Sequence, residues 1–287
     1  MGLQVPVLLY HRIDHSNDFI ATKPDVFRQH LQYLADRGWR SMSLKEFEAC
    51  SKAGQDFPDR RFLLTFDDGY DSLAHTAAPI MEEFEFSGVA FICPHFMARD
   101  GAAYAGRHDE LYKGFLNWEQ ARSLQASGTL EFQSHSHTHS NFAEFTAMEI
   151  ADDLLRSVNL LSQELRLPRH YFRHLAWPWG NSTREWRKIA QNLGFEFQYT
   201  VARTSFQKNG TVLEIPRVCF DAQAFEAFQR QFWLQTGAFA APWNAAYGVA
   251  RSAKQMVRAL RARAGSENLD AAKAKVKKAE VQSPPAP

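Results

Sequence analysis

Short apolar runs alternate with amphipathic helical patterns over most of this 287-residue chain, and this alternation constrains the fold more than any other feature. Residues 25–37 show the helical pattern, with Phe27, Leu31 and Leu34 on one face and Gly38 as the stop signal. Apolar runs that alternate with helices are typical of α/β proteins with parallel strands. We therefore expect an α/β fold, built either as one barrel or as two modest domains.

The expected elements follow from this pattern. Predicted strands lie at residues 5–10, 62–66, 88–92, 130–134, 172–177, 197–201 and 212–216. Predicted helices lie at residues 25–37, 77–84, 185–193 and 222–234, and further helices begin at capping boxes. The boxes are Ser43 with Glu46, Asn117 with Gln120, and Thr146 with Glu149. The helix that begins at Thr146 is expected to extend to about residue 167.

The composition changes after residue 236. No Asp or Glu occurs between Glu226 and Glu267, and basic residues accumulate there on one helical face: Arg251, Lys254, Arg258 and Arg261. A basic amphipathic helix at residues 245–263 could lie on an anionic membrane surface, although a solvated terminal helix has the same pattern. We expect a barrel domain at residues 1–236, a basic helical extension at 237–264 and a disordered tail at 265–287.

Composition indicates an ordinary globular protein, with 45% apolar and 23% charged residues. The formal net charge of +1 gives no reason to expect nucleic acid as a partner. Cys50, Cys93 and Cys219 are scattered, which favours a reducing compartment without a disulfide framework. We interpret residues 5–10 as a first strand rather than a signal peptide. The expected location is the cytoplasm, or the periphery of the inner membrane face.

Polar side chains follow the ends of several predicted strands. Tyr10-His11, Asp67-Asp68, the histidine cluster at residues 135–139 and Trp177-Pro178-Trp179 all occupy this position. In parallel α/β barrels, the loops at the carboxyl ends of the strands build the active site. We therefore expect these segments to converge.

The Asp67-Asp68 pair and the histidine cluster have the composition of a metal site. One carboxylate with two imidazoles binds a borderline divalent ion and leaves a position for water, while the other carboxylate becomes a candidate general base. Asp67 and Asp68 leave the backbone on opposite sides if the strand continues through them; the alternative is a plain Asp-Gly turn. In a helical turn His135 and His139 would share a face. In an extended segment all three histidines, including His137, would share a face. Either arrangement predicts a metal-dependent hydrolase.

The chain resembles a known family at these motifs. Residues 65–69 (Thr-Phe-Asp-Asp-Gly) and 135–139 (His-Ser-His-Thr-His) are similar to the first two motifs of polysaccharide deacetylases, which are carbohydrate esterase family four. Residues 175–180 (Leu-Ala-Trp-Pro-Trp-Gly) resemble the third motif. The similarity extends from residues 7–13 (Val-Leu-Leu-Tyr-His-Arg-Ile) to 215–218 (Ile-Pro-Arg-Val). Its start resembles the subgroup that includes deacetylases of poly-N-acetylglucosamine.

The resemblance implies a distorted (β/α) barrel, usually of seven parallel strands, to which the composition adds the C-terminal helical extension. It also implies hydrolysis of N-acetyl groups on sugars with zinc or a similar divalent ion. Carried over by position, Asp67 is the general base and Asp68, His135 and His139 hold the metal. The ion polarises the amide carbonyl and acidifies a water, and Asp67 takes the water's proton.

Substrate contacts are expected from Tyr70, whose backbone N–H is a candidate donor to the oxyanion, and from the third motif. Trp177, Pro178 and Trp179 are the candidates there. Tryptophans near such a site can stack on sugar rings, although most of the chain's 7 Trp and 23 Phe are expected in the core.

The chain departs from the family pattern in two places. Many relatives carry an Arg that orients the base at the position of Ala176, and Arg217 is the candidate replacement here; an ordinary structural Arg is the alternative. Many relatives also have a general-acid His near the C-terminus, but this chain has no His after His174. His11 is the candidate acid, because His15 lies further into a polar loop.

The leading hypothesis is a cytoplasmic N-deacetylase acting on a glycan precursor, with the sugar linked to a lipid or a nucleotide. A lipid carrier would agree with the basic C-terminal helix. The same site would also suit an O-acetyl esterase, or a hydrolase of a formyl group or a cyclic amide. A catalytically inactive carbohydrate-binding module is the alternative from another class, but such a module has no need for Asp67.

Overall fold

The computed structural model describes residues 4–97, 114–237 and 240–248. The chain divides into one compact unit at Met1–Ala240 and a second at Ala241–Pro287. Residues 240–248 are helical. Most of the predicted basic helix and all of the predicted tail lie outside the described residues, so the predicted boundaries at 237 and 265 stay predictions.

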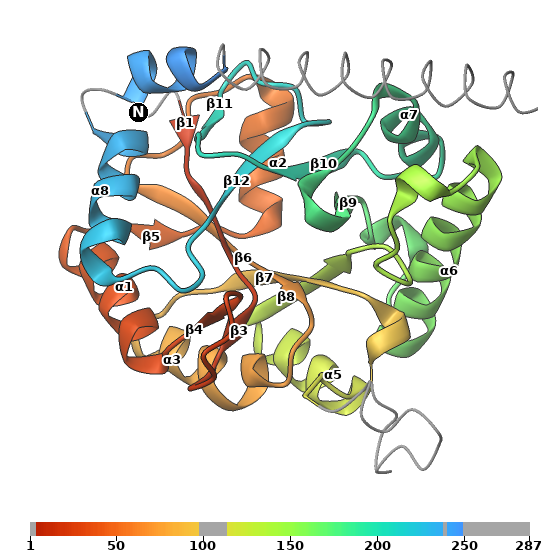
Figure 1. The fold of residues 1–287 in the computed structure, drawn as a ribbon, viewed down its shortest axis with the longest axis horizontal. Helices are drawn as coiled ribbons and strands as arrows, with labels where there is room; N and C mark the ends of the chain where they lie inside the picture. Colours follow the sequence, from red (N-terminus) through yellow and green to blue (C-terminus); the bar gives the residue numbers. More distant parts are fainter. Residues whose placement is uncertain (1–3, 98–113, 238–239, 249–287) are drawn as a thin grey trace, which may run out of the picture. The chain divides into compact units, whose positions relative to one another are not determined.

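A closed barrel of parallel strands forms the first unit (Figure 1). The sheet order is β2-β12-β10-β9-β8-β7-β6-β5, and an additional pairing of β2 with β6 closes the ring and leaves β5 outside it. The ring strands are β2 (Val7–Tyr10), β6 (Arg61–Asp68), β7 (Gly88–Ile92), β8 (Leu130–Ser134), β9 (His174–Ala176), β10 (Phe197–Val201) and β12 (Ile215–Cys219). The predicted seven-stranded (β/α) barrel is therefore confirmed.

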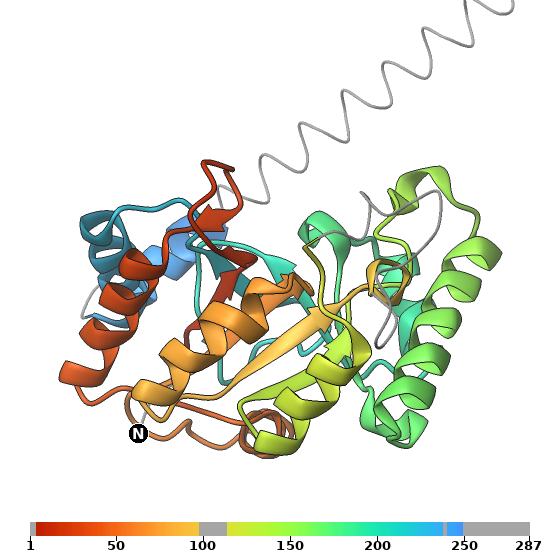
Figure 2. The same ribbon diagram turned by 90° about the horizontal axis from the view of Figure 1, so that it is seen from below.

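Helices surround the strands in both ribbon views (Figures 1 and 2). They are α1 (Pro24–Asp36), α2 (Leu44–Ala53), α3 (Ala78–Glu83), α5 (Trp118–Ser127), α6 (Ala147–Leu165), α7 (Arg184–Asn192) and α8 (Phe225–Thr236). The predicted capping boxes of α2, α5 and α6 are all present. Each N-cap bond satisfies a backbone donor that the helix itself leaves unpaired, which stabilises by about 1 kcal/mol.

Side-chain alternation along the strands separates two apolar cores. In β6, Phe62, Leu64 and Phe66 pack in the outer core under the helices, whereas Leu63 packs inside the barrel. The inner core also contains Phe47 of α2. Because successive strand residues point to opposite faces, the inward row of β6 continues from Leu63 to Asp67. This alternation directs the Asp67 carboxylate into the barrel at the carboxyl end of β6.

Three predicted elements differ most clearly from the structure. The strand predicted at 212–216 is wrong: β12 spans Ile215–Cys219, because a turn with Glu214 N donating to Thr211 O precedes it. The run at residues 5–10 is divided at Pro6 into β1 (Gln4–Val5) and β2; β1 pairs antiparallel with β11 (Phe206–Gln207). The helix predicted at 222–234 begins only at Phe225, after Ala222 adopts a positive φ of 50°.

Short elements that the sequence did not reveal lie mostly near the strand ends. They are β3 (Arg12–Ile13), β4 (Ala21–Thr22), β5 (Arg40–Ser41), the π-helical turn η1 (Leu73–Ala77) and the 3₁₀ turns η2 (Pro94–Phe96), η3 (Phe142–Glu144), η4 (Arg169–Tyr171) and η5 (Pro178–Gly180). Among the described helices, none has the length and apolar character needed to cross a bilayer. All three cysteines are free thiols.

Candidate active site

The predicted polar segments converge at a cavity of about 590 Å³ at the carboxyl end of the barrel. His11, Asp67, Asp68, His135 and His139 all line this cavity. Strand register explains the convergence, because Leu9 pairs with Thr65 and Asp67 pairs with Phe91, so that neighbouring strands end at the same level.

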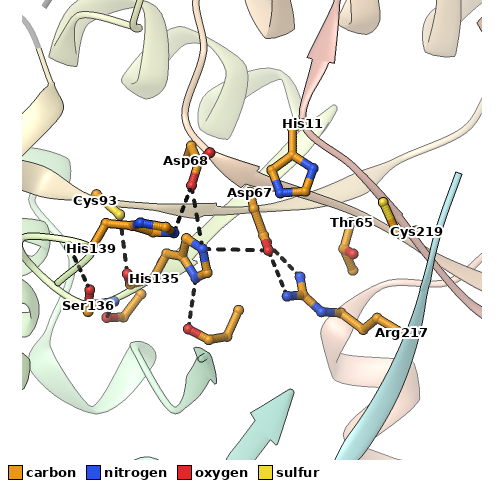
Figure 3. Close-up of polar contacts among 12 residues, drawn as sticks. His11, Thr65, Asp67, Asp68, Cys93, His135, Ser136, His139, Arg217 and Cys219 are labelled. Atoms are coloured by element: carbon orange, nitrogen blue, oxygen red, sulfur yellow. Dashed lines mark hydrogen bonds and ion pairs between the residues drawn. The ribbon is translucent and has the colours of Figure 1, made fainter. Parts of the chain in front are cut away.

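Asp67 forms a buried two-point ion pair with Arg217 (Figure 3). Arg217 Nη1 donates to Asp67 Oδ1 at 2.6 Å and Nη2 donates to Oδ2 at 2.7 Å. The guanidinium carbon lies 5.3 Å from the ring centre of Phe91. Burial alone raises the pKa of the Asp67 carboxyl, but the charges of Arg217 and His135 and the Arg217 hydrogen bonds lower it to about 2. Asp67 is therefore ionised and fixed in orientation.

Asp68 points away from Arg217 toward the imidazoles. Its φ of 70° turns the chain at the strand end, and Gly69 follows with φ of 89°. A Cβ at Gly69 would lie 2.9 Å from Ile92 Cγ2, so only glycine fits there. Asp68 Oδ1 lies 3.5 Å from the Nε2 atoms of both His135 and His139. The two carboxylates share His135, whose Nε2 also lies 3.6 Å from Asp67 Oδ2, but Asp67 pairs with Arg217 whereas Asp68 lies beside His139.

The histidine segment is neither the helical turn nor the extended strand that the sequence left open. Ser136 and His139 have positive φ values of 68° and 55°, which fold the segment into a compact loop. Asp153 of α6 accepts hydrogen bonds from the backbone N–H groups of His137 and Thr138 at 2.8 and 3.2 Å. This anchor holds the loop against the barrel.

The loop brings two of its three imidazoles to Asp68. His135 Nδ1 donates to the Ala176 carbonyl at 2.8 Å, which leaves Nε2 available as a ligand. Burial and the neighbouring His135 lower the pKa of His139 to about 4, so that its imidazole is neutral. His137 instead lies beside His95, with ring centres 5.7 Å apart.

The residues predicted to hold a metal fit that role. One donor atom from each of Asp68, His135 and His139 lies within 4.8 Å of the others. Asp68 Oδ1 is buried and, among the described residues, lacks a hydrogen-bond partner. A buried carboxylate oxygen without a donor is costly unless a cation completes its coordination. Two imidazole nitrogens and one carboxylate oxygen suit zinc and similar ions.

His11 pairs with a carboxylate that the sequence analysis missed. His11 Nδ1 lies 2.6 Å from Asp221 Oδ2, and the His11 backbone N–H donates to Oδ1 at 3.0 Å. Burial alone lowers the pKa of the His11 imidazole, but its hydrogen bonds to Asp221 and Cys219 raise it well above the ordinary value. Asp221 follows the end of β12. With the correct strand boundary, it would have been identified as Asp67 was, as a polar residue at the carboxyl end of a barrel strand.

The predicted substrate contacts divide into two groups. Trp179 is 56% exposed beside the cavity, with its ring centre 4.5 Å from that of His139, and Tyr70 stacks on Phe115 at 4.7 Å. Trp177 is fully buried and donates through Nε1 to Gln198 at 3.1 Å. Neither Trp177 nor Pro178 is among the described residues that line the cavity, so their contact with substrate stays a prediction.

Comparison with known proteins identifies the class that this barrel and site define. Residues 54–198 match the family model for polysaccharide deacetylase, so the chain belongs to the polysaccharide deacetylase family and is a hydrolase. The family predicted from the motifs is confirmed.

Individual relatives are distant in sequence. The poly-beta-1,6-N-acetyl-D-glucosamine N-deacetylase of Staphylococcus epidermidis is 21% identical over 248 residues, which cover 78% of this chain and 82% of the relative. The Escherichia coli K12 protein of the same name is 24% identical over 70% of this chain but only 34% of its own length.

Solved structures share the fold. The Streptococcus pyogenes deacetylase PplD, in complex with acetate, superposes with a TM-score of 0.69 at 18% identity, over 80% of this chain and 99% of its own. IcaB from Ammonifex degensii superposes with a TM-score of 0.67 at 24% identity, over 82% and 98% of the two chains.

Proposed function

We propose that this enzyme removes the N-acetyl group from an N-acetylglucosamine unit of a glycan or glycan precursor, with zinc as its divalent metal ion. The observation that carries the proposal is the buried Asp67–Arg217 pair directly beside the donor atoms of Asp68, His135 and His139. Support for the sugar comes from the activity for which the Staphylococcus and Escherichia relatives are named.

Asp68, His135 and His139 would hold the metal, which supplies Lewis-acid activation of a water and of the substrate carbonyl. Asp67 accepts the proton of the attacking water. The low pKa of Asp67 keeps it ionised throughout the working pH range. Arg217 of β12 fixes the orientation of the Asp67 carboxylate. Many relatives use an Arg at the position of Ala176 for this purpose.

His11 protonates the departing amine. An amine is a poor leaving group unless it gains a proton, and the raised pKa keeps His11 protonated near neutral pH. The Asp221 carboxylate accepts at Nδ1, so the Nε2 proton is the one to be transferred. Tyr70, at the edge of the cavity, contributes the proposed backbone donor for the oxyanion.

Trp179 and Tyr70 would contact the sugar. The exposed ring of Trp179 is suited to packing against the apolar face of a pyranose, whereas the ring of Tyr70 already stacks on Phe115. The cavity volume of about 590 Å³ suits a small ligand or a short part of a larger one.

We further propose a cytoplasmic enzyme acting on a lipid- or nucleotide-linked sugar. This proposal rests on the three free thiols, which are typical of a reducing compartment, and on the basic residues at 245–263, which suit an anionic membrane surface. Cell fractionation tests the location.

The substrate test compares acetate release from β-1,6-linked N-acetylglucosamine oligomers, nucleotide-linked and lipid-linked N-acetylglucosamine, and an O-acetylated sugar. We expect release from N-acetylated substrates, and loss of that release in Asp67→Asn. Release from the O-acetylated sugar alone would overturn the N-deacetylase proposal in favour of an esterase. Release from the polymer but not from carrier-linked sugars would overturn only the precursor proposal.

A further inference from the structure

A second cluster of potential metal ligands lies in the same cavity. His11, Cys219 and Asp221 each offer a donor atom, and these atoms lie within 4.8 Å of one another. Figure 3 shows His11 and Cys219 on the opposite side of Asp67 from His135 and His139. All three residues of the cluster line the cavity, which gives an ion a route to them.

Strand pairing builds this cluster. Cys219 ends β12 and pairs with Leu9 of β2, so His11 and Asp221 follow neighbouring parallel strands at the same end. Asp221 Oδ2 lies 2.6 Å from His11 Nδ1 and 3.1 Å from Cys219 Sγ. The second oxygen of Asp221 accepts the His11 backbone N–H at 3.0 Å, which fixes the carboxylate between its two partners.

We propose that His11, Cys219 and Asp221 form a second metal site, which takes zinc when zinc is in excess and thereby inhibits the enzyme. A thiolate, an imidazole and a carboxylate supply three corners of a tetrahedral zinc site with one position open. The sulfur makes this set softer than Asp68, His135 and His139, so it selects zinc or cobalt over magnesium and manganese. Zinc binding would require only a small movement of the three side chains. Their donor atoms now lie at hydrogen-bond distance and would separate slightly to surround the ion.

Zinc at this site would remove the proton donor. The ion replaces the Nδ1 proton of the His11 imidazolium and the Sγ proton of Cys219, and both protons pass to solvent. The remaining imidazole is neutral and no longer serves as an acid for the amine. This inhibitory consequence rests on the proposed role of His11, whereas the existence of the site does not.

X-ray absorption at the zinc edge tests the site in the full-length protein. With one equivalent of zinc the spectrum should contain only nitrogen and oxygen scatterers, because the first site has no sulfur. A second equivalent should add one sulfur at about 2.3 Å. Cys219→Ser should lose the sulfur signal, whereas Cys50→Ser and Cys93→Ser should keep it. Cys93 is the sharper control, because its buried thiol donates to the His135 carbonyl beside the first site.

Thiol alkylation of the wild-type protein gives a second measurement, which does not require any substituted protein to fold. Zinc beyond the first equivalent should slow alkylation of Cys219, mapped by mass spectrometry, while leaving Cys50 unchanged. Absence of the sulfur signal at two equivalents, or its persistence in Cys219→Ser, would overturn the second site.

The inhibitory arm is measured separately as acetate release against added zinc. Filling the second site should lower amide hydrolysis by about 10²-fold or more, the usual cost of losing a general acid. A sulfur signal without inhibition would leave the second site in place and overturn the role of His11. If binding of the first equivalent of zinc did not depend on Asp68, the proposed function would be overturned instead.

Discussion

Arg217 reaches the same carboxylate as an Arg at the third-motif position would, but from a different strand. Ala176 on β9 has no side chain that could pair with Asp67, whereas Arg217 on β12 forms two hydrogen bonds with it inside the barrel. The sequence identified Arg217 as a candidate without deciding between a structural and an orienting residue. Its fully buried pairing with Asp67 favours the orienting role.

Removal of the Arg217 charge should damage both stability and activity. In Arg217→Gln, Asp67 keeps a buried charge without its partner, which costs about 3–5 kcal/mol in the free energy of unfolding. Urea unfolding measures this loss. Arg28→Gln is the matched control, because Arg28 pairs with Glu83 at the exposed surface and should cost at most about 1 kcal/mol. Equal losses of stability in the two variants would contradict a buried ion pair between Arg217 and Asp67.

The pH dependence should depend on His11. The acid must be protonated, and its folded-state pKa is raised, so activity is retained near neutrality and lost as the pH rises through that pKa. Asp221→Asn removes the main group that raises the pKa. The alkaline limb of the kcat/KM profile should therefore move to lower pH.

His11→Ala should impair hydrolysis of an amide more than hydrolysis of an activated ester, because only the amine needs the proton. Metal content, measured before zinc is added in excess, should barely change. Equal losses on the two substrates would show that the proton donor is another group.

At the scale of elements, the most regular segments could be predicted best. The strands at 88–92, 130–134 and 197–201 and the three capping boxes were predicted to the residue, because each has a strong local signal. The histidine loop could not be predicted, because its shape depends on hydrogen bonds to Asp153, which belongs to another element, α6. The error in β12 hid Asp221 for a similar reason, since the end of that strand is set by its pairing with β2, which is distant in the sequence.

Asp153 should control metal affinity without touching the metal. Its carboxylate accepts two backbone N–H bonds from the histidine loop and a third bond from the Thr138 hydroxyl at 2.6 Å. Asp153→Asn should weaken metal binding about 10–100-fold, as loss of a supporting hydrogen bond does at other metal sites. Titration calorimetry measures this change. Asp152→Asn is the control, because the neighbouring Asp152 is exposed on the same helix, and a matching loss there would exclude a specific anchor.

At the scale of the whole molecule, the barrel explains how residues far apart in sequence form one site. The side chains of β2, β6 and β12 that point into the barrel continue to His11, Asp67 and Cys219. The side chains on the outer face of these strands pack under the helices. The alternation of strands and helices in the sequence predicts this convergence. The pairing of particular side chains, such as Arg217 with Asp67, depends on strand order and barrel closure, which local patterns do not specify.

The basic residues after position 245 should affect location more than chemistry. Deletion from Ala245 onward should reduce binding to anionic liposomes by about 1 kcal/mol for each basic residue that lies near the surface. Hydrolysis of a small soluble substrate should stay unchanged. Sedimentation with liposomes at low salt checks this, and unchanged binding would exclude membrane contact by this segment.

The central claim is that two adjacent carboxylates have different roles, with Asp68 holding the metal and Asp67 acting as base. Zinc content and acetate release, measured on the same samples of Asp67→Asn and Asp68→Asn, test it most directly. We predict that Asp67→Asn keeps one equivalent of zinc and loses about 10²–10⁴-fold in rate, whereas Asp68→Asn loses most of the metal. Near-normal acetate release by Asp67→Asn, or a full equivalent of zinc in Asp68→Asn, would contradict the account.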